Sequence, residues 1–148
     1  MNPKIAFDAD VLIYAAARDH PLGTRVAALF AATDAEEAVG VGSVLLLTEV
    51  LAKPMRDDAD SDECTSLLSL MSRLDLLPFD APTARLSLAL AVSYGLRAAD
   101  AGHLATAVAA GADRFLTNNR KDFPRSIAEI DIVYPDELPV SEVISGAS

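Results

Sequence analysis

The sequence predicts an α/β protein built on an open, parallel sheet of four to five strands. Short apolar runs alternate with longer segments of helical periodicity, and Gly and Pro residues separate many of them. A length of 148 residues with 51% hydrophobic content fits one compact domain with a single core. We therefore expect one domain over residues 1–148, in which residues 135–148 form a weakly patterned C-terminal tail.

The first predicted unit is a strand followed by a helix. The apolar run over residues 4–8 predicts a strand, and residues 11–17 predict a helix. Pro21 and Gly23 then indicate a break, so we expect a second helix to open near Thr24.

The next unit places an acidic residue on a short helix. A strand is predicted over residues 38–42, and Ser43 is a candidate N-cap for the helix that follows. Pro54 disfavours helical geometry in the residue before it, so this helix should stop near Lys53. Glu49 would then lie late on a short helix.

The rest of the chain continues the alternation. Pro82 and Gly95 bracket one apolar helix, and Gly111 is a candidate left-handed cap for the next. An acidic loop over residues 57–63 precedes a leucine-rich helix. The remaining predicted strands cover residues 75–78, 114–117 and 130–134, and the last helix covers residues 100–110.

Cysteine content and hydropathy favour a soluble, cytoplasmic protein. Cys64 is the single cysteine, so no disulfide can form within the chain. Residues 1–4 do not resemble a signal peptide, and the apolar stretch over residues 39–50 is shorter than the ~20 residues that a membrane helix needs. We expect no membrane association.

The net charge of −10 argues against a broad basic surface for nucleic acid. An acidic surface also keeps a protein dispersed, or complements a basic partner. Five basic residues near the C-terminal acids offer either a local positive rim for RNA or ordinary surface charge: Arg97, Arg114, Arg120, Lys121 and Arg125.

Four acids are placed where the carboxyl ends of parallel strands would gather them: Asp8, Glu49, Asp100 and Asp122. Grouped carboxylates raise one another's pKa unless a cation compensates them. Mg²⁺ or Mn²⁺ prefers such oxygen ligands, and could activate water against a phosphodiester. The pattern therefore predicts a metal-dependent phosphodiesterase.

Three segments, IAFDADVLIYA, LLLTEVLAKP and LRAADAGHLATAVAAGADRFLTNNRKDF, resemble the successive signature segments of PIN-domain nucleases. The resemblance spans residues 5 to about 123. It implies a three-layer α/β/α sandwich and a Mg²⁺- or Mn²⁺-dependent ribonuclease, often the toxin of a VapC-like toxin–antitoxin pair. Such a protein would have an RNA substrate and a basic antitoxin partner, and a homodimer is a further candidate assembly.

By position, the resemblance makes Asp8 the first metal carboxylate, Glu49 the second and Asp100 the third. The fourth position is open. Many relatives have an acid where this chain has Asn119, whereas others use the acid that is Asp122 here.

Three further residues are candidate supporting groups: Asp10, Thr117 and Asn119. Thr117 and Asn119 belong to the Thr-Asn strand end of the third segment, and Asn119 could orient water or phosphate. Asp10 stands where the family commonly has a neutral polar residue, so it would either tighten metal binding or cap the first helix.

Each acid also has an ordinary structural interpretation. Asp8 could cap a helix, Glu49 could be solvated, and Asp100 could interact with a helix dipole. His103 lies one turn beyond Asp100, and either contacts phosphate or is a satisfied interface histidine.

Two other function classes are open. FDADV also resembles haloacid dehalogenase-like phosphatases, in which Asp8 would be the nucleophile and Asp10 the general acid. A non-catalytic module that binds RNA or protein is the second alternative.

Overall fold

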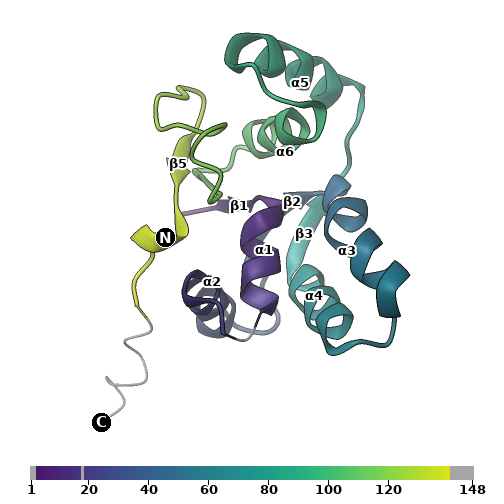
Figure 1. Ribbon diagram of the computed structural model, residues 1–148. Helices are drawn as coiled ribbons and strands as arrows, with labels where there is room; N and C mark the ends of the chain where they lie inside the picture. The colour runs from purple at the N-terminus through teal and green to yellow at the C-terminus, as the bar shows by residue number, and fades with distance from the viewer. Residues whose placement is uncertain (1–2, 18, 141–148) are drawn as a thin grey trace.

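Five parallel strands form one sheet in the order β3-β2-β1-β4-β5 (Figure 1). The computed structural model describes residues 3–17 and 19–140, so the end of the predicted tail, residues 141–148, lies outside the described residues. The strands are β1 (Ile5–Phe7), β2 (Gly40–Ser43), β3 (Leu74–Leu77), β4 (Arg114–Leu116) and β5 (Asp131–Val133).

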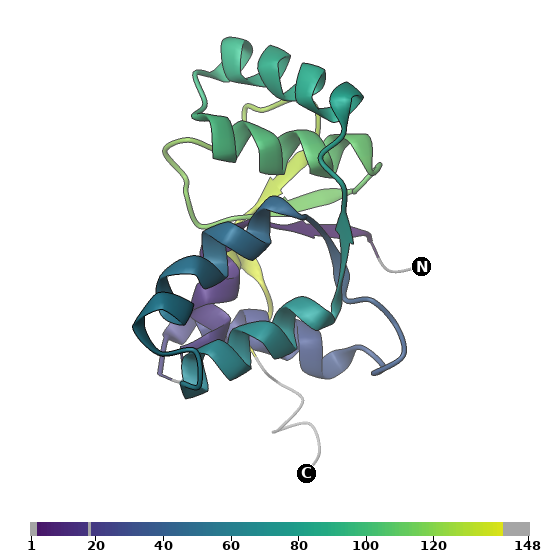
Figure 2. The same cartoon turned by 90° about the vertical axis from the view of Figure 1, so that its right-hand side faces the viewer.

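Helices cover both faces of this sheet and make three layers (Figure 2). Helices α5 and α6 lie on one side, and α1 to α4 lie on the other. Within the described residues, no helix combines the length and the apolar character required to cross a membrane. The helices are α1 (Ala9–Ala16), α2 (Pro21–Ala32), α3 (Leu45–Asp58), α4 (Asp62–Ser72), α5 (Ala81–Tyr94) and α6 (Ala98–Ala109), followed by the short 3-10 helix η1 (Pro135–Glu137).

Alternating strand residues divide the core between the two helical layers. Ala6 and Phe115 pack in the cluster that includes α6, whereas Phe7 and Leu116 pack in the cluster that includes α1 to α4. Successive side chains of a strand point to opposite faces, so both faces of these central strands are apolar and buried. The predicted α/β/α sandwich is confirmed.

The order of the strands reverses between β1 and β4. From β1 the chain moves outward to β2 and β3, and then returns to the other side of β1 with β4. Phe7 pairs with Leu116 at the carboxyl ends of these two strands. Ligands of doubly wound sheets bind in the crevice at such a switch point.

The predicted break at Pro21 and Gly23 is wrong, because α2 begins at Pro21. His20 caps this helix, since its Nδ1 accepts hydrogen bonds from the N–H groups of Leu22 and Gly23. Proline suits the first helical turn, where its missing N–H costs nothing. Gly23 has a packing function: a Cβ there would lie 2.0 Å from the carbonyl oxygen of Tyr14 on α1.

The predicted end of the third helix near Lys53 is also wrong, because α3 continues through Pro54 to Asp58. An internal proline removes one helix hydrogen bond and costs about 3 kcal/mol. Tertiary contacts oppose that cost, since α3 packs against α4. The thiol of Cys64 and the N–H of Ser61 both donate to the carbonyl oxygen of Asp58 at the end of the helix.

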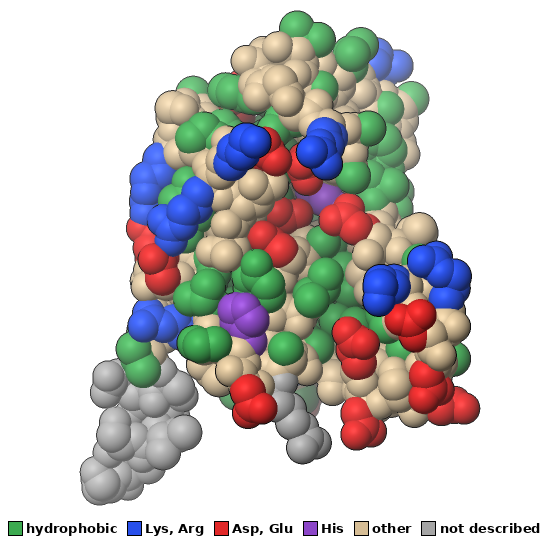
Figure 3. Space-filling view, in the orientation of Figure 1, with side chains coloured by type: hydrophobic (Ala, Val, Ile, Leu, Met, Phe, Trp, Pro, Cys, Tyr) green, Lys and Arg blue, Asp and Glu red, His purple; other side chains and the backbone are tan. Residues whose placement is uncertain are grey.

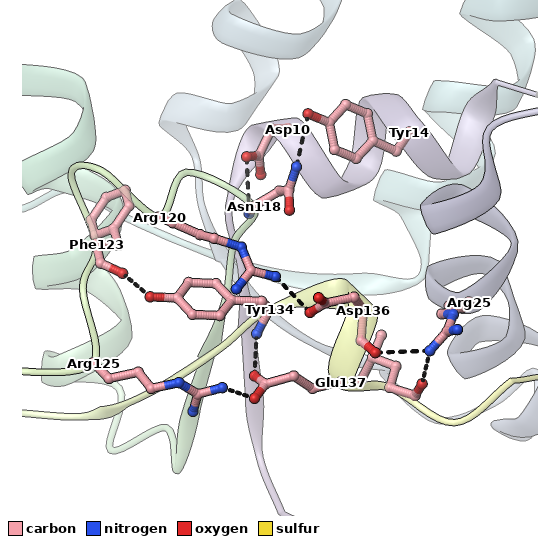
Figure 4. A network of polar contacts seen from close by, with 11 residues as sticks. Asp10, Tyr14, Arg25, Asn118, Arg120, Phe123, Arg125, Tyr134, Asp136 and Glu137 are labelled. Atoms are coloured by element: carbon pink, nitrogen blue, oxygen red, sulfur yellow. Dashed lines mark hydrogen bonds and ion pairs between the residues drawn. The ribbon is translucent and has the colours of Figure 1, made fainter.

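A cluster of charged side chains around Tyr134 fixes the segment after β5. Two guanidinium groups flank the ring of Tyr134, with Arg120 4.1 Å and Arg125 5.0 Å from the ring centroid (Figure 4). Arg120 pairs with Asp136 at 2.6 Å, and Arg125 pairs with Glu137. We call these five residues the C-terminal clamp.

Candidate metal centre

Asp8 follows β1 at the switch point and is 4% exposed. Its Oδ1 accepts the N–H of Ala9 at 2.8 Å, and its Oδ2 accepts the hydroxyl of Thr117 at 2.7 Å. The pairing of Phe7 with Leu116 brings Asp8 and Thr117 side by side. Asp8 is therefore both the N-cap of α1 and a fixed carboxylate at the strand ends. Burial raises the pKa of Asp8, and the hydrogen bond from Thr117 opposes that rise.

Glu49 from α3 meets His103 from α6. Glu49 Oε1 lies 2.8 Å from His103 Nε2, and one ligand atom from each of Asp8, Glu49 and His103 lies within 4.8 Å of the other two. The hydrogen bond from His103 lowers the pKa of Glu49. Burial lowers the pKa of His103, but its bond to Glu49 and the nearby carboxylates raise it by more, to above its ordinary value.

Asp10 is a third acid at this edge, in the first turn of α1. Its Oδ2 accepts the backbone N–H of Asn118 at 3.0 Å, and the side chain of Asn118 reaches Tyr14 (Figure 4). Its buried Oδ1 has no hydrogen-bond partner among the described residues. Burial and the charge of Asp8 raise the pKa of Asp10 to about 7. The capping alternative for Asp10 is wrong, because Asp8 caps the helix.

Asp100 and Asp122 lie near these residues, outside the 4.8 Å group. Burial raises the pKa of Asp100, and the charges of Asp8, Asp122 and Glu49 raise it further. Asp122 Oδ2 accepts a hydrogen bond from Asn119 Nδ2 at 2.9 Å, so the two candidates for the fourth position contact each other. Repulsion between carboxylates opposes a closer approach in the absence of a cation.

We call these five acids, Asp8, Asp10, Glu49, Asp100 and Asp122, the acidic site. Acidic side chains gather in a hollow in the middle of one face, beside a histidine and with Lys and Arg side chains nearby (Figure 3). Among the ion pairs of the described residues, the one that reaches the acidic site is Glu49 with His103. Raised carboxyl pKa values and the unpartnered oxygen of Asp10 fit a site for a divalent cation with oxygen ligands.

The structure brings the predicted acids to one edge and adds a residue that sequence reasoning set aside. His103 is buried on α6 and hydrogen-bonded to Glu49 on α3, as a satisfied interface histidine would be, and this contact also places it beside the acids. Its position three residues after Asp100, on the same helix, was the available signal. Two residues of the predicted positive rim, Arg120 and Arg125, are paired in the C-terminal clamp.

The fold and this site define an α/β protein with a candidate metal centre at its switch point. The family model of the PIN domain matches residues 5–128. The chain therefore belongs to the PIN domain family, which confirms the resemblance found in the sequence. Family membership leaves the phosphatase alternative without support.

Solved structures share this fold at low sequence identity. A toxin–antitoxin complex from Klebsiella pneumoniae has a TM-score of 0.67 and 23% identity, covering 89% of this chain and 97% of that chain. VapBC2 from Rickettsia felis, bound to a promoter DNA fragment, has a TM-score of 0.67 and 18% identity, with coverage of 88% and 97%. DNA-bound VapBC from Salmonella typhimurium has a TM-score of 0.71 and 17% identity, with coverage of 90% and 99%. A search of curated proteins gives no match.

Proposed function

We propose that this protein is a divalent-metal-dependent ribonuclease that hydrolyses RNA phosphodiester bonds. The observation that carries the proposal is the acidic site, in which the buried carboxylate of Asp8 lies with partly buried and exposed carboxylates, and no Lys or Arg of the described residues forms an ion pair with any of them. PIN domains are generally nucleases, which supports this chemistry. The site is the basis for this function, because one fold hosts many activities.

Asp8, Glu49, Asp100 and Asp122 are the proposed ligands of Mg²⁺ or Mn²⁺. Both ions prefer oxygen ligands, and Mg²⁺ keeps several of its waters when it binds. A bound divalent cation supplies charge neutralisation for a phosphate and lowers the pKa of a coordinated water. Thr117 holds Asp8 in place through its hydroxyl.

The supporting residues fix the rest of the site. Asn119 donates its backbone N–H to Thr117 Oγ1 at 3.1 Å and its side-chain amide to Asp122. This loop therefore connects Asp122 with the residue that holds Asp8. Because burial and the charge of Asp8 raise the pKa of Asp10 to about 7, cation uptake near neutral pH should release protons.

We further propose that the protein is the toxin of a toxin–antitoxin pair, acting as a single PIN domain in the cytoplasm. The solved structures of this fold include toxin–antitoxin complexes. The net charge of −10 suits a basic antitoxin.

An apolar groove and the exposed face of α5 that borders it support protein partners. A groove of about 700 Å³ between α3, α5 and α6 is lined by Leu45, Phe79 and Leu88, among others, and reaches Glu49. Leu88 and Val92 on α5 are 67% and 77% exposed. Exposed apolar patches mark interaction sites, here for an antitoxin or a second copy of the chain.

A cleavage assay tests the activity. Single-stranded and structured RNA should be cut in the presence of Mg²⁺ or Mn²⁺ and left intact in EDTA. RNA that is bound but never cut by metal-loaded protein would favour the non-catalytic module instead. A beryllofluoride adduct at Asp8 would revive the phosphatase alternative.

A genetic test addresses the toxin proposal. The reading frame immediately upstream should encode a small, basic protein, and its co-expression should relieve growth arrest caused by this chain. If expression of the active nuclease leaves growth unchanged, RNA processing replaces the toxin proposal.

A further inference from the structure

Among the described residues, His103 is the one hydrogen-bond partner of the Glu49 carboxylate. The His103 side chain is fully buried, whereas the Glu49 side chain is 37% exposed. Asp8, by contrast, is buried and held by both of its oxygens. We propose that His103 is a positioning residue, whose Nε2–H holds the Glu49 carboxylate beside Asp8 for the cation. This inference rests on the proposed metal-dependent function.

The direction of the hydrogen bond distinguishes positioning from metal ligation. An ionised carboxylate only accepts hydrogen bonds, so Nε2 of His103 carries the proton that points at Glu49. The other ring nitrogen, Nδ1, is buried and has no partner among the described residues. A neutral histidine that bound a metal through Nε2 would place an unpaired N–H at Nδ1, and orphaned buried N–H groups are rare. In the proposed arrangement the neutral His103 donates from Nε2 to Glu49, leaves only a lone pair unpaired at Nδ1, and is not itself a ligand.

Close packing of α6 against α3 makes this contact reachable. A Cβ on Gly102 would lie 2.7 Å from Leu45 Cδ1 and 3.3 Å from Phe79 Cε1, so glycine permits the approach of the two helices. Leu45 lies four residues before Glu49 on α3, and His103 is the next residue after Gly102. Residues four apart lie on the same face of a helix. The Gly102–His103 pair thus places an imidazole directly against Glu49.

Calorimetric titration of Mn²⁺ into the full chain tests the assignment. Partners that orient metal ligands typically change affinity by about 10–100-fold, so His103→Leu should weaken Mn²⁺ binding by about tenfold or more. In His103→Gln the amide N–H can replace Nε2–H, and most of the affinity should return. The chain offers a matched control in His20, which caps α2: His20→Leu should leave the Mn²⁺ affinity unchanged.

A double-mutant cycle shows whether His103 acts through Glu49. If it does, His103→Leu should add little to the loss already caused by Glu49→Gln. Losses that multiply in the double variant would overturn the positioning assignment, as would His103→Gln binding as weakly as His103→Leu. Circular dichroism confirms that each variant is folded before titration.

The same titrations separate this inference from the proposed function. If the wild-type protein binds Mn²⁺ and Asp8→Asn does not, but His103→Leu binds like the wild type, only the positioning assignment fails. If the folded wild-type protein takes up no Mn²⁺, the proposed metal-dependent function fails and the assignment fails with it.

Discussion

The acidic site and the C-terminal clamp contain similar acids in opposite electrostatic settings. In the clamp, Asp136 pairs with Arg120 and Glu137 pairs with Arg125, and the two guanidinium groups flank Tyr134. In the acidic site, the carboxylates face one another across the strand ends, and burial and mutual repulsion raise the pKa of several of them.

This difference indicates which acids are available to bind a cation. Carboxylates that have an arginine partner are already compensated and serve to fix a segment of the chain. Carboxylates that lack one are costly to keep ionised and buried, and they gain most from a cation. The two regions should therefore respond in opposite ways to substitution and to metal.

The largest expected effect is on cleavage. Asp8→Asn and Asp100→Asn each remove a proposed metal ligand, so each should lower the rate of RNA cleavage by about a thousandfold or more. The same change in the clamp, Asp136→Asn, is the matched control and should leave the rate near that of the wild type. Steady-state cleavage rates of the folded variants test this prediction. An active Asp100→Asn variant would contradict the proposed difference between the acidic site and the clamp.

Truncation of the clamp should instead affect stability. Tyr134 is 4% exposed and its hydroxyl donates to the carbonyl oxygen of Phe123 at 2.7 Å. Tyr134→Ala should lower the free energy of unfolding by about 3–5 kcal/mol, and Tyr134→Phe by about 1 kcal/mol. Urea denaturation measures both, and equal midpoints for Tyr134→Ala and the wild type would refute the clamp as a stabilising element.

Metal-free protein should lose stability as pH rises from about 4 to about 7. The pKa of Asp10 is about 7 in the folded protein against an ordinary 3.8, so the folded state binds more protons in this window. The raised pKa of Asp8 acts in the same direction. The loss should be on the order of 2–4 kcal/mol, since each pKa unit corresponds to about 1.4 kcal/mol.

Denaturation in EDTA at about pH 5 and about pH 7.5 checks this expectation. The lowered pKa of Glu49 acts below its ordinary value of 4.5 and does not reverse the trend. Asp10→Asn should flatten the pH dependence, and bound Mn²⁺ should do the same by compensating the carboxylates. Stability that increases across this window would contradict the raised pKa values.

The smallest expected effect comes from the exposed ion pairs of the clamp. Arg120 and Asp136 are 50% and 52% exposed, so solvent screens their attraction. Arg120→Ala should cost about 1 kcal/mol or less, including the contact with Tyr134. A loss several times larger in urea denaturation would show that the clamp behaves as a buried network.

The sequence was sufficient to predict the strands and the edge at which the acids meet. Asp8 follows the short apolar run that forms β1, and Asp100 lies in the first turn of the predicted helix that forms α6. The course of α3 through Pro54 was not predictable, because packing against α4 opposes a local preference. The start of α2 at Pro21 depends on an unusual cap by His20.

The detailed contacts of the site were harder to foresee. His103 and Glu49 are 54 residues apart, and their contact depends on the close approach of α6 to α3 at Gly102. No local sequence pattern specifies how closely two helices so far apart in the chain approach each other. Asn119 and Asp122 compete as candidates in the sequence, whereas the structure shows that they are hydrogen-bonded to each other.

The most direct test of the account is electron paramagnetic resonance of Mn²⁺ mixed with the folded wild-type protein, Asp8→Asn and Asp136→Asn. Bound Mn²⁺ loses the sharp signal of the free ion. The account predicts loss of that signal with the wild type and Asp136→Asn, and its persistence with Asp8→Asn. A free-ion signal that persists with the folded wild type, or that disappears equally with all three proteins, would contradict the claim that the uncompensated acids form the cation site.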